Sequence, residues 1–143
     1  MATIVTDDGF IADDRANEFL DWTEAAQDPA DLPYGAAVEI PNSLSGEELV
    51  PGFDRIAHLR ICFPSHVDGR GFTLARHLRR LGYAGRLRAS GHLLADQYVM
   101  ARRCGFDEVE IDDELARRQP ESVWQQSWQQ QTASYQFLLQ REA

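Results

Sequence analysis

The sequence predicts a single α/β domain with about four parallel strands and flanking helices, followed by a C-terminal helix. Three observations predict this class. The chain has 143 residues, the size of one domain, and 43% of them are hydrophobic, enough for a core. Short apolar segments alternate with helical segments between residues 36 and 111, and short connections join them. Both a flavodoxin-like sheet and half of a β/α barrel remain compatible with this pattern.

The N-terminal part is less regular. Residues 1–11 are expected to form a tail or an edge strand. Residues 13–27 carry apolar side chains at three-to-four spacing, which predicts an amphipathic helix that Asp13 or Asp14 caps. Prolines then break the pattern, so residues 28–35 are expected to be a linker. The chain is accordingly divided into an N-terminal tail and helix (1–33) and an α/β domain (34–143).

Strands and helices alternate in the predicted α/β domain. Apolar runs bounded by proline or glycine predict strands at 36–40, 59–63, 86–90 and 107–111. Helical spacing predicts helices at 72–82 and 93–104, each ended by a glycine. Ser45 and Glu48 have the spacing of a capping box, which indicates a short helix from residue 45 to 49.

The C-terminal part is helical in a different way. Residues 112–118 are expected to form at least one helical turn that Pro120 breaks. Residues 121–139 predict a long amphipathic helix, with Trp124, Trp128, Gln131, Tyr135 and Leu138 along one face. Two interpretations stay open for its tryptophans. The helix covers the domain's own sheet, or it contacts a partner, which includes a homodimer through Trp124 and Trp128.

The formal net charge of −9 is unevenly distributed. Residues 1–54 carry 13 acidic residues and one arginine, whereas residues 55–103 carry ten arginines and two aspartates. Residues 104–143 are again acidic, and the chain has no lysine. Arginine-only basicity is explained either by codon bias in a GC-rich genome or by bidentate contacts with oxyanions. The basic segment either binds an anion or is neutralised by the acidic ends.

Several classes of protein are disfavoured by the sequence. The chain has neither an apolar run long enough to span a membrane nor the pattern of a signal peptide, so a cytoplasmic protein is expected. The acidic flanks and the lack of a recognised motif argue against nucleic-acid binding. Cys62 and Cys104 are too few for a disulfide framework or a four-cysteine zinc site. A metal site is not expected either, because no third ligand is fixed beside the loop histidines. The sequence shows neither a complete catalytic set nor a cofactor motif, so no cofactor is expected.

The loop after the second predicted parallel strand is the first candidate site. Ligands of parallel α/β sheets bind beyond the carboxyl ends of the strands. In this loop, Asp68 precedes Gly69-Arg70-Gly71, and a helix follows at once. Glycines permit close backbone approach, and a helix N-terminus offers free amides to an anion. The alternative is a tight loop in which Asp68 and Arg70 simply pair.

Two arginines on the third predicted strand need partners. Arg86 and Arg88 are two residues apart, so they point to the same face of the sheet. Asp96, near the same edge, is the expected partner. Such a network either holds a ligand or is purely structural.

A long collinear series of residues resembles one bacterial family. The series runs from Phe63-Pro64 through Asp68-Gly69-Arg70-Gly71-Phe72-Thr73-Leu74-Ala75-Arg76, Leu78-Arg79, Gly82-Tyr83, Leu87-Arg88-Ala89 and Asp96-Gln97 to Arg103-Cys104-Gly105-Phe106-Asp107. It is similar to the domain-of-unknown-function family 934, small proteins typically encoded beside assimilatory sulfite reductase and sometimes labelled probable oxidoreductases. Ser65-His66-Val67 and His92 depart from the family pattern.

The resemblance implies an accessory protein of sulfite reduction, with sulfite reductase or a related redox protein as partner. An oxyanion or that partner would bind an arginine-rich rim. The alternatives are a small enzyme acting on an anionic substrate and a structural or dimerising module. The candidate residues for binding an anion or a partner are Asp68, Gly69, Arg70, Gly71, Arg76, Arg88, Asp96, Gln97 and Arg103.

Overall fold

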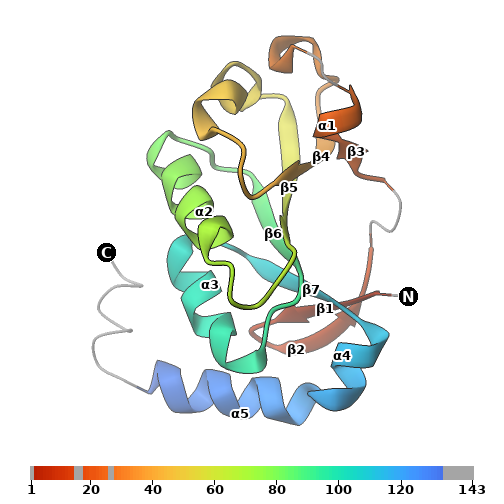
Figure 1. Ribbon diagram of the computed structural model, residues 1–143, viewed down its shortest axis with the longest axis vertical. Coiled ribbons are helices and arrows are strands. Elements are labelled where there is room, and N and C mark those ends of the chain that lie inside the picture. Colours follow the sequence, from red (N-terminus) through yellow and green to blue (C-terminus); the bar gives the residue numbers. More distant parts are fainter. Residues whose placement is uncertain (1, 15–17, 26–27, 134–143) are drawn as a thin grey trace.

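A mixed sheet of seven strands forms the centre of the computed structural model, which describes residues 2–14, 18–25 and 28–133 (Figure 1). The strand order across the sheet is β2-β1-β7-β6-β5-β4-β3. The strands are β1 (Ala2–Thr6), β2 (Gly9–Ala12), β3 (Leu20–Asp21), β4 (Ala36–Pro41), β5 (Ile56–Phe63), β6 (Arg86–Gly91) and β7 (Glu108–Asp112).

The five strands from β3 to β7 run parallel to one another. The four strands expected from the sequence correspond to β4, β5, β6 and β7, with ends that differ by up to three residues. A single α/β domain is therefore confirmed, but its sheet is mixed and larger than expected. The carboxyl ends of β4 to β7 lie along one edge of the sheet, as parallel pairing requires.

The first strands of the chain join the same sheet as the predicted α/β domain. Residues expected to be a tail or an edge strand form a hairpin, in which β1 pairs antiparallel with both β2 and β7. Ile4 and Val5 are buried, and Gly9 has φ +125°, which suits the hairpin turn. β2, not β1, is the edge strand.

The prediction of a helix over residues 13–27 is wrong. Residues 15–17 and 26–27 lie outside the described residues, and the rest contribute only β3 and the four-residue α1 (Trp22–Ala25). Leu20 pairs with Val38 of β4, and Phe19 packs on His58 of β5. Apolar spacing of three to four residues here reflects contacts with the sheet, so the helical interpretation failed through tertiary packing.

The segment expected to be a linker is packed rather than free. It contains the short 3-10 helix η1 (Pro29–Asp31), and Asp28 caps this helix by accepting a hydrogen bond from the Ala30 amide. Leu32 directly after it is completely buried. Leu32 therefore fixes the segment to the core, while most other residues of 28–35 are exposed.

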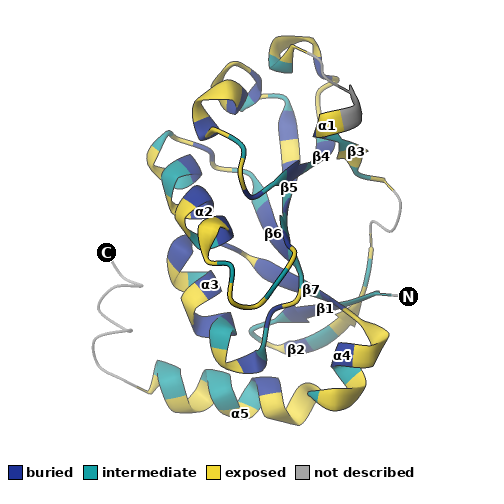
Figure 2. Cartoon of the chain, in the orientation of Figure 1, coloured by how far each residue is buried: buried dark blue, intermediate teal, exposed yellow. Residues whose placement is uncertain are grey.

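The helices α2 (Arg70–Arg80) and α3 (Tyr98–Cys104) lie side by side over one face of the sheet (Figures 1 and 2). Leu74, Ala75 and Leu78 of α2 are buried, as the helical spacing predicted. The helix expected from residue 93 is α-helical only from Tyr98, after the 3-10 helix η3 (Ala95–Gln97). Gly105 ends α3 with φ +109°, as expected from its position.

The segment with the spacing of a capping box is a 3-10 helix, η2 (Gly46–Gly52). Ser45 makes no side-chain cap, because its hydroxyl donates to Glu47 at 2.7 Å instead. The predicted capping box is therefore wrong, although a short helical element is present.

The last two helices close one end of the sheet. The carboxylate of Asp112 accepts from the Leu115 amide at 2.8 Å and caps α4 (Asp113–Arg118). α5 (Glu121–Thr132) buries Trp124 completely, and Trp128 packs edge-on against Tyr98. Trp124 thus belongs to the chain's own core and has no surface left for a second copy. The homodimer itself stays a prediction, and Tyr135 and Leu138 lie outside the described residues.

No helix among the described residues is long and apolar enough to cross a membrane.

Candidate functional site

The predicted site residues do not form one site. Asp68, Gly69, Arg70 and Gly71 lie at the carboxyl edge of β5 and the start of α2. Arg88 lies on β6 and is completely buried. The remaining candidates are grouped around α2 and α3, and they are Arg76, Asp96, Gln97 and Arg103. These three places have different chemistry.

The loop before α2 is closed by its own ion pair. Nε and Nη2 of Arg70 donate to the carboxylate of Asp68 at 3.0 and 2.8 Å, and the Arg70 amide donates at 3.2 Å. Asn42 adds a fourth donor at 3.0 Å. The bonds from Arg70, then Asn42, hold the pKa of Asp68 well below its usual range, and Asp68 in turn raises the pKa of Arg70. The N-terminus of α2 already holds a carboxylate, as in the tight-loop interpretation.

The two glycines of this loop have different roles. A Cβ on Gly71 would lie 2.3 Å from Cζ of Phe63, so the helix packs on that ring only because Gly71 has no side chain. A Cβ on Gly69 would meet nothing within 4 Å. Gly71 therefore serves packing, whereas Gly69 leaves open space above the loop.

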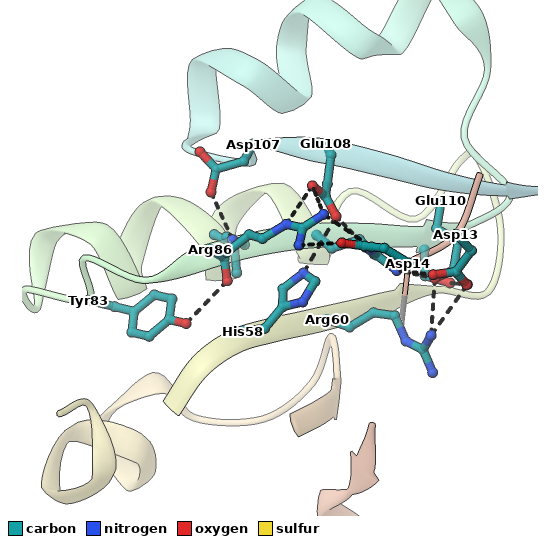
Figure 3. A network of polar contacts seen from close by, with 12 residues as sticks. Asp13, Asp14, His58, Arg60, Tyr83, Arg86, Asp107, Glu108 and Glu110 are labelled. Carbon is teal, nitrogen blue, oxygen red and sulfur yellow. Dashed lines mark hydrogen bonds and ion pairs between the residues drawn. The ribbon is translucent and has the colours of Figure 1, made fainter. Parts of the chain in front are cut away.

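Arg88 is the centre of a charged network, and Figure 3 shows other members of it, among them Arg86, Glu108 and Glu110. Its guanidinium donates to Glu108 and to Glu110, the latter at 2.9 Å. It also donates to Asp13 and Asp14, each at 3.0 Å. Every nitrogen of this buried cation thus has a carboxylate partner, which burial of a charge demands.

Asp96, the expected partner of Arg86 and Arg88, is not their partner. Arg86 instead bonds Glu108 at 2.7 Å and Asp14 at 3.1 Å. Side chains alternate between the faces of a strand, so both arginines point away from the helices, while Asp96 lies on the helical side. The network is built from β7 and the N-terminal segment.

Arg60 extends the network to the neighbouring strand. Its Nε donates to Glu39 at 3.0 Å, its Nη1 donates to Glu110 at 3.1 Å, and its guanidinium stacks on Phe19 at 4.1 Å. Beside it, the thiol of Cys62 donates to Glu39 at 2.9 Å. Burial, then Glu39, raise the pKa of this thiol to about 12, so Cys62 is not an activated nucleophile.

Glu108 and His58 are the titratable pair at the buried end of the network. Burial alone would raise the pKa of Glu108, but its contacts with His58, Arg86 and Arg88 lower the pKa to about 2. Nε2 of His58 lies 3.5 Å from Oε2 of Glu108, and neither ring nitrogen makes a hydrogen bond with a described residue. Burial is the main cause that lowers the pKa of His58.

Sequence reasoning missed most of this network, although a signal was present. Polar residues occupy every second position of three adjacent strands, namely His58, Arg60 and Cys62 on β5, Arg86, Arg88 and Ser90 on β6, and Glu108 and Glu110 on β7. Such alternation shows that one face of the sheet is charged. Aligning the strands would have matched the arginines with the glutamates.

The acidic ends of the chain fold back onto the basic segment. Asp7 accepts from Arg102 at 3.0 Å, and Asp107 accepts from Arg79 at 3.1 Å. Together with Asp13, Asp14, Glu108 and Glu110, these carboxylates pair with five of the ten arginines between residues 55 and 103, namely Arg60, Arg79, Arg86, Arg88 and Arg102. The excess of positive charge in the sequence is therefore largely cancelled in the fold.

Arg55, Arg76 and Arg80 have no carboxylate partner among the described residues. Arg55 donates to the Leu32 carbonyl and stacks on Tyr34, whereas Arg76 and Arg80 are exposed on α2. Arg76 has one polar contact with the described residues, from Nη2 to Sγ of Cys104 at 3.7 Å, and Arg80 has none. They line a hollow of about 690 Å³ between α2 and α3. We call it the α2–α3 groove, and its residues are Phe72, Thr73, Arg76, Arg80, Asp96, Gln97, Met100 and Cys104.

The other wall of the α2–α3 groove is fixed by Gln97. Its side-chain oxygen accepts from the Leu94 amide at 2.8 Å, and its Nε2 donates to the carbonyl of His66 at 2.7 Å. Gln97 therefore ties η3 to the loop before α2. Arg103, the last candidate, is exposed in the final turn of α3 and does not line the groove.

A second hollow of about 800 Å³ lies at the carboxyl edge on the charged face. Its lining includes Arg60, Ser90, Glu110 and Asp13, whose polar groups already bond one another or Arg88. Within the described part of the chain, no group of three or more histidine, cysteine or acidic side chains could hold a metal ion.

Comparison with known proteins gives one match. The model of a family described as a bacterial protein of unknown function (DUF934) matches residues 37–143. This range includes the groove and most of the charged network. Neither the curated proteins nor the solved structures contain a match.

Proposed function

This chain belongs to the DUF934 family of bacterial proteins of unknown function, and from that premise we propose that it is an accessory protein of assimilatory sulfite reduction. It acts by binding an oxyanion or the acidic surface of a redox partner such as the reductase. The binding groups are the arginines that its own acidic ends leave unpaired.

The observation that carries the proposal is the contrast between two sets of arginines. Arg60, Arg79, Arg86, Arg88 and Arg102 are each neutralised by a carboxylate of the chain. Arg76 and Arg80 have no carboxylate partner among the described residues, yet they stand side by side at a groove. Exposed guanidinium groups that remain unpaired favour an anionic ligand from outside the chain.

Binding is favoured over catalysis by the positions of the candidate residues. An enzyme acting on a small anion would need Asp68, Arg70, Arg88 and Asp96 within reach of one ligand. Arg88 is instead enclosed in ion pairs on the opposite face, and Asp68 is already bound by Arg70. The groove offers a ligand two guanidinium groups and apolar side chains beside the exposed carboxylate of Asp96, a mixture that suits recognition.

Growth on sulfate tests the proposal. A strain that lacks the gene should grow slowly when sulfate or sulfite is the sulfur source and normally on cysteine. Complementation should succeed with wild type and with the control Arg117→Ala/Arg118→Ala, which removes two arginines from α4. It should fail with Arg76→Ala/Arg80→Ala at equal protein level. Normal growth of the deletion strain on sulfate would contradict the proposal.

A further inference from the structure

We infer that the α2–α3 groove binds an acidic peptide segment of a partner protein, anchored by an apolar side chain of that segment between Phe72 and Met100. The inference rests on the proposed function and makes it more specific, because it chooses a protein partner over a small oxyanion.

The positions of the donors argue against a small oxyanion. A buried anion site needs several donors that converge on one point. The place where the fold offers such donors is the N-terminus of α2, and Asp68 fills it. Arg76 and Arg80 are both exposed, so water would compete there for a single small ion.

The spacing of the two arginines fits two carboxylates. Residues four apart on a helix are neighbours on its surface, with Cβ atoms about 5–6 Å apart. Arg76 and Arg80 therefore present two separate guanidinium forks along one wall of the groove. Acidic side chains one turn apart on a partner helix have the same spacing, so each fork can receive one carboxylate.

The apolar part of the groove supplies the anchor. Met100 of α3 is 46% exposed, which is high for a large hydrophobic residue, and Phe72 lies opposite it on α2. Cys104 is buried at the base with 4% exposure. Methionine adapts its shape to a bound side chain, and partly desolvated apolar pockets beside charged groups are typical of peptide-binding surfaces. A sulfate or sulfite ion would make no use of these residues.

The chain's own C-terminal segment is the main competing occupant. Gln131 near the end of α5 donates to the carbonyl of Asp96, a groove residue, at 3.3 Å, so the described end of α5 lies beside the groove. Residues 134–143, however, include one acidic residue, Glu142, and one basic residue, Arg141. Glu142 is thus the one carboxylate side chain of this segment, whereas the arginine pair fits two.

The test uses a labelled helical peptide with two glutamates four residues apart and a leucine between them. A matched peptide carries glutamine at both positions. Fluorescence anisotropy with the full chain should show binding of the acidic peptide and at least ten-fold weaker binding of the glutamine peptide. Arg76→Gln/Arg80→Gln should weaken acidic-peptide binding at least ten-fold, and the control Arg117→Gln/Arg118→Gln should not. Met100→Ser should weaken it as well.

Backbone amide NMR of the same titration locates the peptide. We expect the amide chemical shifts of α2, η3 and α3 to change. Equal binding of both peptides would overturn the inference, and so would shifts confined to another surface. Displacement of the peptide by sulfate that is only equimolar with the two arginines would overturn it as well. It would also be overturned if the chain without residues 134–143 bound the peptide much more tightly, since the segment would then be the occupant. If the peptide experiments failed while the chain still bound sulfite reductase, peptide binding in the groove would be rejected and the proposed function would stand.

Discussion

Arg88 and Asp13 are 75 residues apart in the chain, and Nη1 of the first donates to the carboxylate of the second at 3.0 Å. Arg88 is completely buried, and the side chain of Asp13 is 7% exposed. This bond and the bonds of Asp14 hold the N-terminal segment on the charged face of the sheet, where no described α-helix covers Arg88. The acidic ends of the sequence thus complete the fold of its basic middle.

Replacing Arg88 with leucine should lower the free energy of unfolding by about 3–5 kcal/mol, because Glu108 and Glu110 would stay buried without their cation. Urea denaturation followed by tryptophan fluorescence measures this loss. Arg117→Leu on α4 is the control and should change stability by less than about 0.5 kcal/mol. A loss below about 1 kcal/mol for Arg88→Leu would show that the network does not stabilise the fold.

The free energy of unfolding should decrease as the pH drops below about 6.5, the ordinary pKa of histidine. Burial lowers the pKa of His58 in the folded chain, so the unfolded chain binds a proton first and gains relative stability on acidification. Urea midpoints at pH 7 and pH 5 should therefore differ less in His58→Leu than in wild type, while His92→Leu on the surface should match wild type. If the urea midpoints of His58→Leu differed between pH 7 and pH 5 as much as those of wild type, His58 would not cause the loss of stability.

The alternating strands and helices from β4 to β7 could be predicted from the sequence, and the N-terminal strands could not. Strands β4 to β7 each carry buried apolar residues, at every second position in β6 and β7, and glycine ends α3, so local signals and tertiary structure agree. For Phe19 and Leu20, spacing indicated a helix, but contacts with His58 and Val38 on strands far along the chain decide the structure. Local helix propensity gives no information about such long-range contacts.

The binding role of the candidate residues stays a prediction, and only their contacts with one another can be compared with the structure. The pairing of Asp68 with Arg70 was one of the two interpretations of the loop, and the need of Arg86 and Arg88 for partners was also correct. The identity of those partners failed, because strand order and register decide that Arg88 lies opposite Glu108. Arg76 was among the residues proposed from the sequence, whereas Arg80 becomes a candidate only after the ion pairs are assigned.

The two glycines of the loop before α2 should respond differently to alanine. Gly71→Ala should cost about 1–3 kcal/mol, since its Cβ would overlap the ring of Phe63. Gly69→Ala should be neutral or stabilise by up to about 1 kcal/mol, because its φ of −84° suits alanine and the space is open. Thermal denaturation of both variants measures the difference. Equal destabilisation would refute the packing role assigned to Gly71.

Cys62 should react slowly with iodoacetamide at pH 8 although it is partly exposed. Burial and the carboxylate of Glu39 raise its pKa, so little thiolate is present. Glu39→Gln should accelerate its alkylation, which peptide mass spectrometry follows. Glu114→Gln on α4 is a control that should leave the rate unchanged. Fast alkylation of Cys62 in the wild type would contradict this environment.

Calorimetric titration of purified assimilatory sulfite reductase into this chain is the direct test of the proposed function. We expect saturable binding that Arg76→Ala/Arg80→Ala weakens at least ten-fold and that Arg117→Ala/Arg118→Ala leaves unchanged. Absence of binding, or equal affinity of wild type and Arg76→Ala/Arg80→Ala, would contradict it.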